Sequence, residues 1–512
     1  MRHERPPEPN ALAPENTLAG LATLDPAEDL QVTFCRPGGI SSMSHARLWE
    51  EVERVARLFD QMGLRRGDRV GVCLGNRAEW VLIDLACLHL GLVVAGFDPM
   101  KFVPSAALMD RYGLRVLVTE EAMPGTMPVT RLHDAPDPAW PLPPWPAYRA
   151  GDEVALKFTS GSTGAAKAIA ATWGSIGMSL SAVEEMFDHG PGDTLFVFLT
   201  LSLLQQRYWV YTALLRGTDL VIATPQTALF ALRAAQPSVI MGVPAFFETL
   251  KTLIETEADA AGCTPREAAK SATGGRVRYM WTGSAPIRPA LLAWLEDVAG
   301  LPVFEGYGMN ETCIVTKNHP GACRRGSAGR PVRGKEVFVG EDGVIRVRAR
   351  FPVNTRYAFA DPGASARVFR GDTVWTGDLG RIDEDGFLWI TGRADDVIVL
   401  ENGRNIATRE IEERALAVPG VSHCTLAGSG RPWLVALVAA AEGADLGAVL
   451  AAINADATPD TRVHSALRMT APPTEANGCL TSQGKPVRKA ILDAHSDLIE
   501  AAYSKENDHA RA

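Results

Sequence analysis

A loop rich in hydroxyl groups and glycine follows the apolar strand expected over residues 154–158. It begins at Thr159 with the run TSGSTG, and Lys167 follows shortly after. Hydroxyl and backbone N–H donors with little steric bulk suit a loop that wraps a polyphosphate, and a lysine adds a point charge for the outer phosphates. The loop departs from the G-x-x-x-x-G-K-[ST] pattern, because Ala166 and Ala168 flank the lysine.

Three further segments carry side chains suited to nucleotide chemistry. Residues 306–312 (GYGMNET) offer an aromatic face, two glycines for close approach and a carboxylate. Residues 375–378 (WTGD) end in an acid, and Gly392-Arg393 follows the next expected strand. Residues 480–485 (LTSQGK) place a lysine near the C-terminus. Each segment alone is compatible with a cap, a turn or a solvated charge, whereas their order and spacing together are specific.

The elements that must position these residues alternate between helical and extended patterns. Residues 46–62 place apolar side chains on one helical face, and residues 70–74 then form a strand. Residues 80–90 are again helical, and 92–95 are extended. This order favours α/β layers around parallel sheet.

A second, smaller unit is expected after residue 395. It contains two helical and two extended segments, over residues 409–418, 424–428, 433–439 and 446–455. Together they make an α+β unit of ordinary domain size.

Composition excludes several classes of protein. The 512 residues are 46% hydrophobic and 22% charged, which excludes a disordered or coiled-coil chain. The net charge of −9 disfavours nucleic-acid binding. Asp84 and His89 interrupt the most apolar segment, so we expect no membrane span. The eight cysteines include no CxxC pair, which indicates free thiols and a cytoplasmic location.

The four motifs together resemble the acyl-adenylate-forming superfamily, which includes acyl- and aryl-CoA synthetases, peptide-synthetase adenylation domains and luciferases. The resemblance covers roughly residues 32–492 and is densest over 375–413. It implies an α/β fold with a large N-terminal AMP-binding domain of layered α/β subdomains, residues 1–394. A small mobile α+β lid domain, residues 395–512, would carry the adenylation lysine.

The resemblance also implies a reaction in two halves. A carboxylate attacks the α-phosphate of Mg-ATP and gives acyl-AMP and pyrophosphate. A thiol of CoA, or the pantetheine of an acyl carrier protein, then takes the acyl group. Because the protein has little covalent work to do, catalysis is positioning and charge neutralisation.

Carried onto this sequence, the resemblance gives the nucleotide motifs their roles. The β- and γ-phosphates would be held by Thr159, Ser160, Gly161, Ser162, Thr163, Gly164 and Lys167. The adenine pocket would be lined by the backbone of Gly283, Ser284 and Ala285. Tyr307 would stack on adenine, with Gly308 and Thr312 also at the nucleotide, while Asp378 and Arg393 would bind the ribose.

The catalytic roles implied by the resemblance fall on three residues and a hinge. Glu311 would bind Mg²⁺, which prefers oxygen ligands. Asn310 stands where the family usually has threonine, and its amide still offers a donor to the α-phosphate. Lys485 would stabilise the charge that develops there. Asp395 occupies the position of the hinge between the two domains.

The acid itself is less well specified. Family members that activate amino acids use an Asp to pair with the ammonium group, and no acid occurs between Asp193 and Asp219. Leu204 and Trp281 could line an apolar tunnel, whereas Gln205 could contact a polar group of an aryl acid. We expect a fatty or other non-amino acid. The alternatives are an aryl-acid or amino-acid enzyme that loads a carrier protein, a luciferase-like monooxygenase, and a non-catalytic nucleotide-binding protein.

Overall fold

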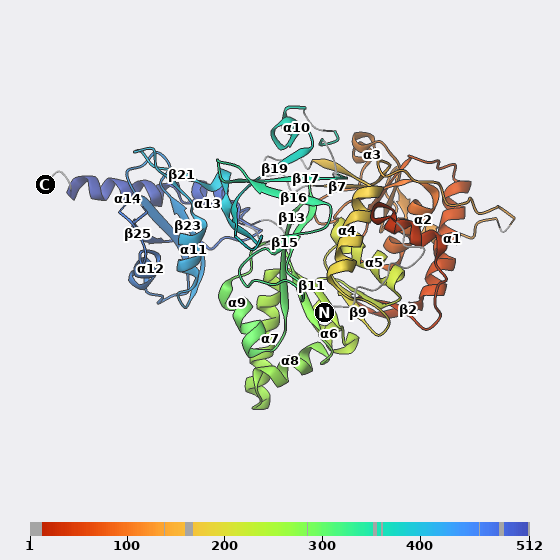
Figure 1. The fold of residues 1–512 in the computed structure, drawn as a ribbon, viewed down its shortest axis with the longest axis horizontal. Helices are drawn as coiled ribbons and strands as arrows, with labels where there is room; N and C mark the ends of the chain where they lie inside the picture. The colour runs from red at the N-terminus through yellow and green to blue at the C-terminus, as the bar shows by residue number, and fades with distance from the viewer. Residues whose placement is uncertain are drawn as a thin grey trace. The chain divides into compact units, whose positions relative to one another are not determined.

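The structure is a computed structural model, and it describes residues 13–137, 139–158, 167–283, 285–351, 356–359, 362–459, 461–480 and 486–509. The chain forms two compact units (Figure 1). The first comprises Met1–Ile287, Leu291–Val337 and Val347–Trp375, and the second comprises Arg288–Ala290, Phe338–Arg346 and Thr376–Ala512.

The larger sheet of the first unit has nine strands, in the order β15-β14-β13-β12-β11-β9-β10-β1-β2. Its strands from β13 to β1 run parallel, whereas β14, β15 and β2 form antiparallel pairs at the two ends. The bounds are β1 (Gln31–Arg36), β2 (Gly39–Ser44), β9 (Thr194–Val197), β10 (Asp219–Ala223), β11 (Val239–Gly242), β12 (Tyr279–Thr282), β13 (Val303–Met309), β14 (Cys313–Lys317) and β15 (Arg330–Pro331).

A six-stranded sheet in the same unit has the order β6-β5-β3-β4-β7-β8. Strand β8 pairs antiparallel with β7, and Phe158 lies opposite Ala168, so the predicted phosphate loop connects two strands of one hairpin. The bounds are β3 (Arg69–Cys73), β4 (Val93–Gly96), β5 (Leu114–Thr119), β6 (Met127–Pro128), β7 (Glu153–Phe158) and β8 (Ala168–Thr172).

Helices cover these sheets, and their sequences explain how deeply each is buried. Helix α2 is buried on nearly every side because its residues are almost all apolar, and Gly91 ends it in the left-handed conformation. Helix α4 begins with a capping box between Thr172 and Ser175. The helices are α1 (His45–Gln61), α2 (Ala78–Leu90), α3 (Ala106–Tyr112), α4 (Trp173–Met186), α5 (Leu204–Arg216), α6 (Ala228–Ala235), α7 (Pro244–Ala261), α8 (Pro265–Thr273), α9 (Pro289–Ala293) and α10 (Pro362–Val368).

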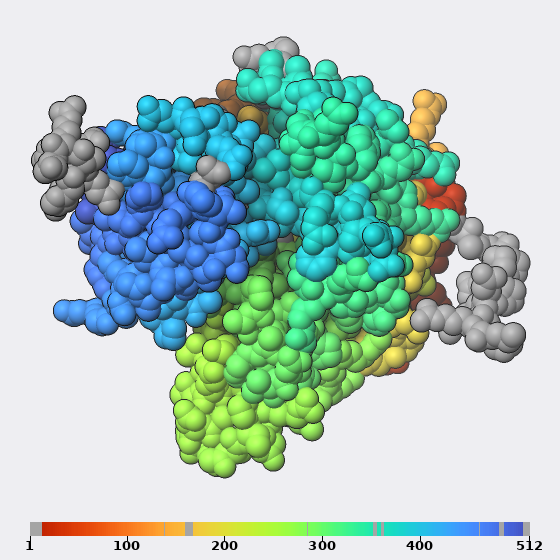
Figure 2. Space-filling view, turned by 60° about the vertical axis from the view of Figure 1, so that its left-hand side comes forward, coloured from red at the N-terminus to blue at the C-terminus, as the bar shows by residue number. Residues whose placement is uncertain are grey.

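Helices α6, α7 and α8 pack together with the larger sheet through a separate apolar cluster that includes Phe196, Ile240 and Phe247. Figure 2 shows the atoms of the green part of the chain, to which α7 and α8 belong, gathered in one contiguous region of the surface. The main apolar cluster instead joins both sheets with α1, α2, α4 and α5.

A third sheet has the order β16-β17-β19-β18, with β20 paired to β19. The bounds are β16 (Lys335–Val339), β17 (Val344–Ala349), β18 (Phe369–Arg370), β19 (Thr373–Ile382) and β20 (Leu388–Arg393).

The remaining C-terminal elements form a small α+β arrangement around the sheet β23-β24-β25. The strands are β21 (Ile398–Val399), β22 (Asn405–Ile406), β23 (Val421–Ala427), β24 (Leu434–Ala440) and β25 (Val463–Arg468). The helices are α11 (Arg409–Leu416), α12 (Leu446–Ile453), α13 (Arg488–Ala494) and α14 (Ser496–His509).

The observed architecture confirms the predicted α/β fold class, with a large N-terminal and a smaller C-terminal part. The two compact units divide between Trp375 and Thr376. The predicted domain boundary at residue 395 and the mobility of the lid stay predictions. Among the described residues, no helix is long and apolar enough to cross a membrane.

Candidate active site

Two of the predicted site residues, Lys167 and Glu311, lie against the same tyrosine. The hydroxyl of Tyr357 donates a hydrogen bond of 2.6 Å to the Glu311 carboxylate. The Lys167 ammonium lies 4.8 Å from the centre of the Tyr357 ring. Burial, and the adjacent Glu311 carboxylate, raise the pKa of Tyr357, so the tyrosine stays a neutral donor. The structure thus brings together a cation predicted for the phosphates and an anion predicted for magnesium.

The turn between β13 and β14 presents the acidic residue of the GYGMNET motif. Asn310, Glu311 and Thr312 form this turn, and the Thr312 hydroxyl accepts a hydrogen bond of 3.2 Å from the Met309 amide. Gly308 is required next to it, since an added Cβ would lie 2.1 Å from the Cys313 carbonyl oxygen. The glycine therefore permits the tight hairpin that fixes Glu311 in a buried position.

The predicted adenine-binding residues lie on neighbouring strands. Gly283 follows β12, and a Cβ added to it would lie 3.4 Å from the carbonyl oxygen of Gly306 on β13. Tyr307 is the next residue on β13 and is half-buried, as is Ala285. The backbone after β12 and the tyrosine of the motif therefore lie close together at the ends of two parallel strands.

The predicted ribose-binding pair lies within the second unit. The Arg393 guanidinium donates to the Asp378 carboxylate at 2.7 Å, across the pairing of β20 with β19. Burial would lower the pKa of Arg393, but Asp378 raises it above its usual value. Asp395 follows in a short 3₁₀ turn with its side chain 86% exposed, and it lies 3.4 Å from the same guanidinium.

Several predicted residues lie outside the described part of the chain. They are Thr159, Ser160, Gly161, Ser162, Thr163 and Gly164 of the phosphate loop, Ser284, and Lys485. The described residues on either side of 481–485 pair with each other, because Leu480 and Pro486 form an antiparallel bridge.

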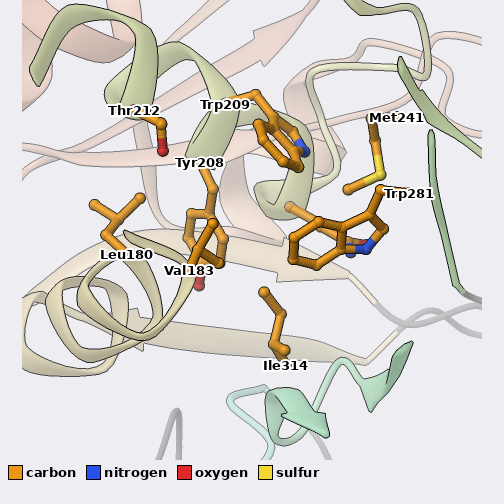
Figure 3. A pocket seen from close by; sticks show the side chains of 9 residues that line it. Leu180, Val183, Tyr208, Trp209, Thr212, Met241, Trp281 and Ile314 are labelled. Atoms are coloured by element: carbon orange, nitrogen blue, oxygen red, sulfur yellow. The ribbon is translucent and has the colours of Figure 1, made fainter. Parts of the chain in front are cut away.

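A pocket opens between α4, α5 and the larger sheet (Figure 3). The empty space between its walls, including the part that is open to solvent, is about 230 Å³. The rings of Trp209 and Trp281 meet edge to face, with their centres 5.2 Å apart, and Tyr208 points into the same space. The lining residues are Leu180, Val183, Gln205, Tyr208, Trp209, Thr212, Met241, Trp281 and Ile314.

The pocket contains two of the three residues predicted for the acid. Gln205 and Trp281 line it, whereas Leu204 is buried at the start of α5 and does not. Because a helix turns about 100° per residue, adjacent positions face different surroundings. None of the nine lining residues in the described chain is Asp or Glu.

A polar cluster borders the pocket and was not predicted from the sequence. The Tyr208 hydroxyl lies 3.1 Å from the Cys313 sulfur, and the Lys157 ammonium lies 3.3 Å from the same sulfur. Lys335 donates a hydrogen bond of 2.9 Å to the Thr312 carbonyl. One signal was available, since Lys157 interrupts an otherwise apolar strand.

The lysines set the electrostatics of this cluster. Burial opposes ionisation of Cys313, but the charges of Lys157 and Lys335 outweigh it, so the pKa of the thiol falls below its usual value. Burial lowers the pKa of Lys335 to about 8, although Cys313 partly offsets this. The cluster is therefore a region of positive potential beside the pocket.

Comparison with known proteins identifies the family. A family model described as "AMP-binding enzyme" matches residues 25–345, and one described as "AMP-binding enzyme C-terminal domain" matches residues 395–507. The chain belongs to the AMP-binding enzyme family. The resemblance inferred from the motifs is confirmed.

Curated relatives of this AMP-binding enzyme are acid–CoA ligases. The long-chain-fatty-acid–CoA ligase FadD15 of Mycobacterium bovis is 26% identical, over 87% of this chain and 89% of its own. The mitochondrial acyl-coenzyme A synthetase ACSM4 of Mus musculus is 27% identical, over 72% of this chain and 69% of its own.

Solved structures share the fold of this AMP-binding enzyme. The o-succinylbenzoate CoA synthetase of Bacillus subtilis, in complex with its acyl-adenylate, has a TM-score of 0.74 at 21% identity. It covers 93% of this chain and 97% of its own. ATP-bound MatB of Rhodopseudomonas palustris has a TM-score of 0.77 at 22% identity, over 94% of this chain and 99% of its own.

The family and the curated relatives together establish the class of reaction. The protein is an AMP-forming acid–thiol ligase, which activates a carboxylic acid with ATP and transfers the acyl group to a thiol. The predicted set of ATP, Mg²⁺ and an acceptor thiol is that of this class.

Proposed function

We propose that the substrate is a carboxylic acid with an apolar body and no α-ammonium group, either a fatty acid or another non-amino acid. The observation that carries this proposal is the pocket of Figure 3, whose described walls are mainly aromatic and aliphatic, with Gln205 and Thr212 as polar exceptions, and include no carboxylate. An ammonium buried there would lack an anionic partner, which costs several kcal/mol. The naming of the relatives as fatty-acid–CoA ligases supports the same substrate class.

Glu311 is the residue we assign to magnesium, and its surroundings fit that ion. Tyr357 donates to one of its carboxylate oxygens, which orients the group. Mg²⁺ commonly takes one or two protein carboxylates and completes its shell with substrate phosphates and water. When bound, magnesium neutralises phosphate charge.

The remaining nucleotide roles are proposed residue by residue. Lys167 would meet the outer phosphates together with the loop Thr159–Gly164, and Asn310 the α-phosphate. Tyr307 and the backbone of 283–285 would hold adenine, while Asp378, oriented by Arg393, would accept the ribose hydroxyl donors. Supporting this, Asp378 is held at 2.7 Å by Arg393 and so has a fixed orientation.

In the proposed mechanism, the acid in the pocket attacks the α-phosphate and pyrophosphate leaves. Lys485 would stabilise the charge on the reacting phosphate during this step only. The acyl-AMP would then react with the thiol of CoA, after a rotation about Asp395, and release AMP. Transfer to an acyl carrier protein is the alternative, and the cytoplasmic location stays a prediction.

Pyrophosphate exchange across a panel of acids tests the proposed substrate class. We expect exchange with carboxylic acids that have an apolar body, and none above background with free amino acids. Discrimination of about 10³ follows from leaving an ammonium unpaired in the pocket. Robust exchange with an α-amino acid would contradict the proposal.

The variant Lys485→Ala tests the assignment of the adenylation lysine. We expect adenylation to fall by about 10²–10³, because one charge aimed at the phosphate is lost. Thioester formation from synthetic acyl-AMP should be nearly unchanged. Equal loss in both half-reactions would remove Lys485 from the proposed role.

A further inference from the structure

Two lysines of the cluster lie beside the pocket, one fully and one partly buried. Lys157, the second-last residue of β7, is 4% exposed, and Lys335, at the start of β16, is half-buried. Lys157 points to the Cys313 sulfur, and Lys335 to the Thr312 carbonyl. Cys313 and Thr312 are adjacent in the chain, so both ammonium groups converge on one short segment.

Neither lysine has a carboxylate partner among the described residues. The ion pairs of this part of the chain are formed by other basic side chains, such as Arg207 and Arg393. A buried ammonium normally pairs with an anion, because desolvation without one costs several kcal/mol. A thiol and a backbone carbonyl provide at most one negative charge for two positive ones. The cluster therefore has a surplus of positive charge that a ligand could neutralise.

The cluster is continuous with the acid pocket. The ring of Tyr208 lines the pocket, while its hydroxyl lies 3.1 Å from Cys313. Ile314, the residue after Cys313, also lines the pocket. Figure 3 shows the side chains of Tyr208 and Ile314 at the border of this space. The pocket wall is thus linked through Cys313 to Lys157, and Lys335 contacts the neighbouring residue Thr312.

We propose that Lys157, Lys335 and the Tyr208 hydroxyl form an anion subsite for a second carboxylate of the substrate, so that the enzyme prefers a short dicarboxylic acid. This inference rests on the proposed function, because it concerns the acid that occupies the same pocket. One carboxylate would react at the nucleotide and the other would lie at the cluster. The lining side chains leave little enclosed space in the pocket, which favours a short chain.

The nucleotide phosphates are the other anions that could bind at the lysine cluster. The contacts of the lysines favour the substrate carboxylate instead. Lys167, which is assigned to phosphate, and Glu311, which is assigned to magnesium, meet at Tyr357. Lys157 instead meets a sulfur that is shared with Tyr208 of the pocket wall. The nucleotide-binding charges and the lysine cluster are thus associated with different tyrosines, Tyr357 and Tyr208.

Three acids with the same five-carbon chain test the subsite by pyrophosphate exchange. They are pentanoic acid, glutaramic acid with a neutral far end, and glutaric acid with a charged one. We expect kcat/KM of the wild-type enzyme to be about ten- to a hundredfold higher for glutaric acid than for the others, because a charged hydrogen bond is gained. Lys157→Met and Lys335→Met should each remove this preference and leave KM for ATP unchanged.

The exposed Lys270 of α8 provides the matched control, and Lys270→Met should keep the wild-type preference. If Lys157→Met does not fold, the half-buried Lys335 still gives a usable variant. Equal or better exchange with pentanoic acid would overturn the subsite. So would a loss of exchange with all three acids together with a raised KM for ATP, which would assign the lysines to the phosphates.

Calorimetric titration of glutaric acid into the nucleotide-free enzyme separates this inference from the proposed function. If no acid supports exchange, the proposed function fails, and the titration then decides the subsite. Binding that is lost in both lysine variants would support it, and absence of binding to the wild-type protein would overturn it.

Discussion

Two consecutive residues of α5, Arg207 and Tyr208, reach two buried charge centres that are built differently. Arg207 is 1% exposed and donates to the Asp84 carboxylate at 2.8 Å, while the Tyr211 hydroxyl donates to the other oxygen of Asp84 at 2.7 Å. Burial would lower the pKa of Arg207, but Asp84 and Tyr211 raise it above its usual value. At the other centre, Tyr208 meets Cys313 beside two lysines that have no carboxylate partner in the described chain.

The two centres differ in what their charges can do. The charge of Arg207 is structural, whereas the charges of Lys157 and Lys335 are available to a ligand. In the Arg207–Asp84 pair the charges cancel inside the protein, so removal of either leaves the other unpaired. In the Lys157–Lys335 cluster the two ammonium charges repel each other, and the Cys313 sulfur can offset at most one of them.

The largest expected effect is on the first centre. Arg207→Met leaves the Asp84 carboxylate buried with one hydroxyl donor, and we expect the free energy of unfolding to fall by about 3–5 kcal/mol. Lys157→Met should leave the free energy of unfolding within about 1 kcal/mol of the wild-type value, or raise it. Urea denaturation measures both. Comparable losses in the two variants would erase the distinction between the centres.

The sign of the coupling within each centre is the next test. In a double-mutant cycle, Arg207→Met and Asp84→Asn together should cost less than the sum of the two, by about 1–3 kcal/mol. For Lys157→Met with Lys335→Met we expect the opposite sign, because the first substitution already relieves the second lysine. A favourable coupling between the lysines would show that Cys313 compensates both of them.

The smallest effect concerns a third buried basic residue, His189, which is neutral and therefore needs no anionic partner. His189 hydrogen-bonds to the Tyr279 hydroxyl at 2.5 Å, and burial lowers its pKa to about 4. The unfolded chain then binds the proton between about pH 6.5 and 4, so stability is lost as the pH falls through that window.

Between pH 7 and 5 the contribution of His189 to this loss should be about 1–2 kcal/mol. His189→Gln should therefore lose that much less stability than the wild type, and thermal denaturation at the two pH values measures the difference. An identical pH dependence in both proteins would contradict a neutral His189.

Local patterns were enough to predict much of the fold. The helix expected over 46–62 is α1, the strand expected over 154–158 is β7, and the helix and strand expected over 446–455 and 433–439 are α12 and β24. Each is a contiguous segment whose periodicity directly records which side is buried. The family and the reaction class followed from motifs that are contiguous for the same reason.

The orientation of single side chains was harder to predict. The sequence pointed to Leu204 for an apolar acid and to Gln205 for a polar contact with an aryl acid, and only Gln205 lines the pocket. A rotation of about 100° separates them, and the packing of α5 between α4 and the sheet sets that rotation. Tyr357, which orients Glu311, gave no signal because it lies far from the motif in sequence.

The sequence by itself determined the nucleotide motifs, the enzyme family and the absence of an acid from residues 194–218. Only the tertiary structure decided which charges meet at the pocket. Lys157, Tyr208, Cys313 and Lys335 come from β7, α5, β14 and β16, and none of them predicts the others in sequence. The sequence shows that a lysine lies within a strand. Whether that lysine has a counter-charge depends on the elements that pack against it, because electrostatic energy is set by distance in space and by burial.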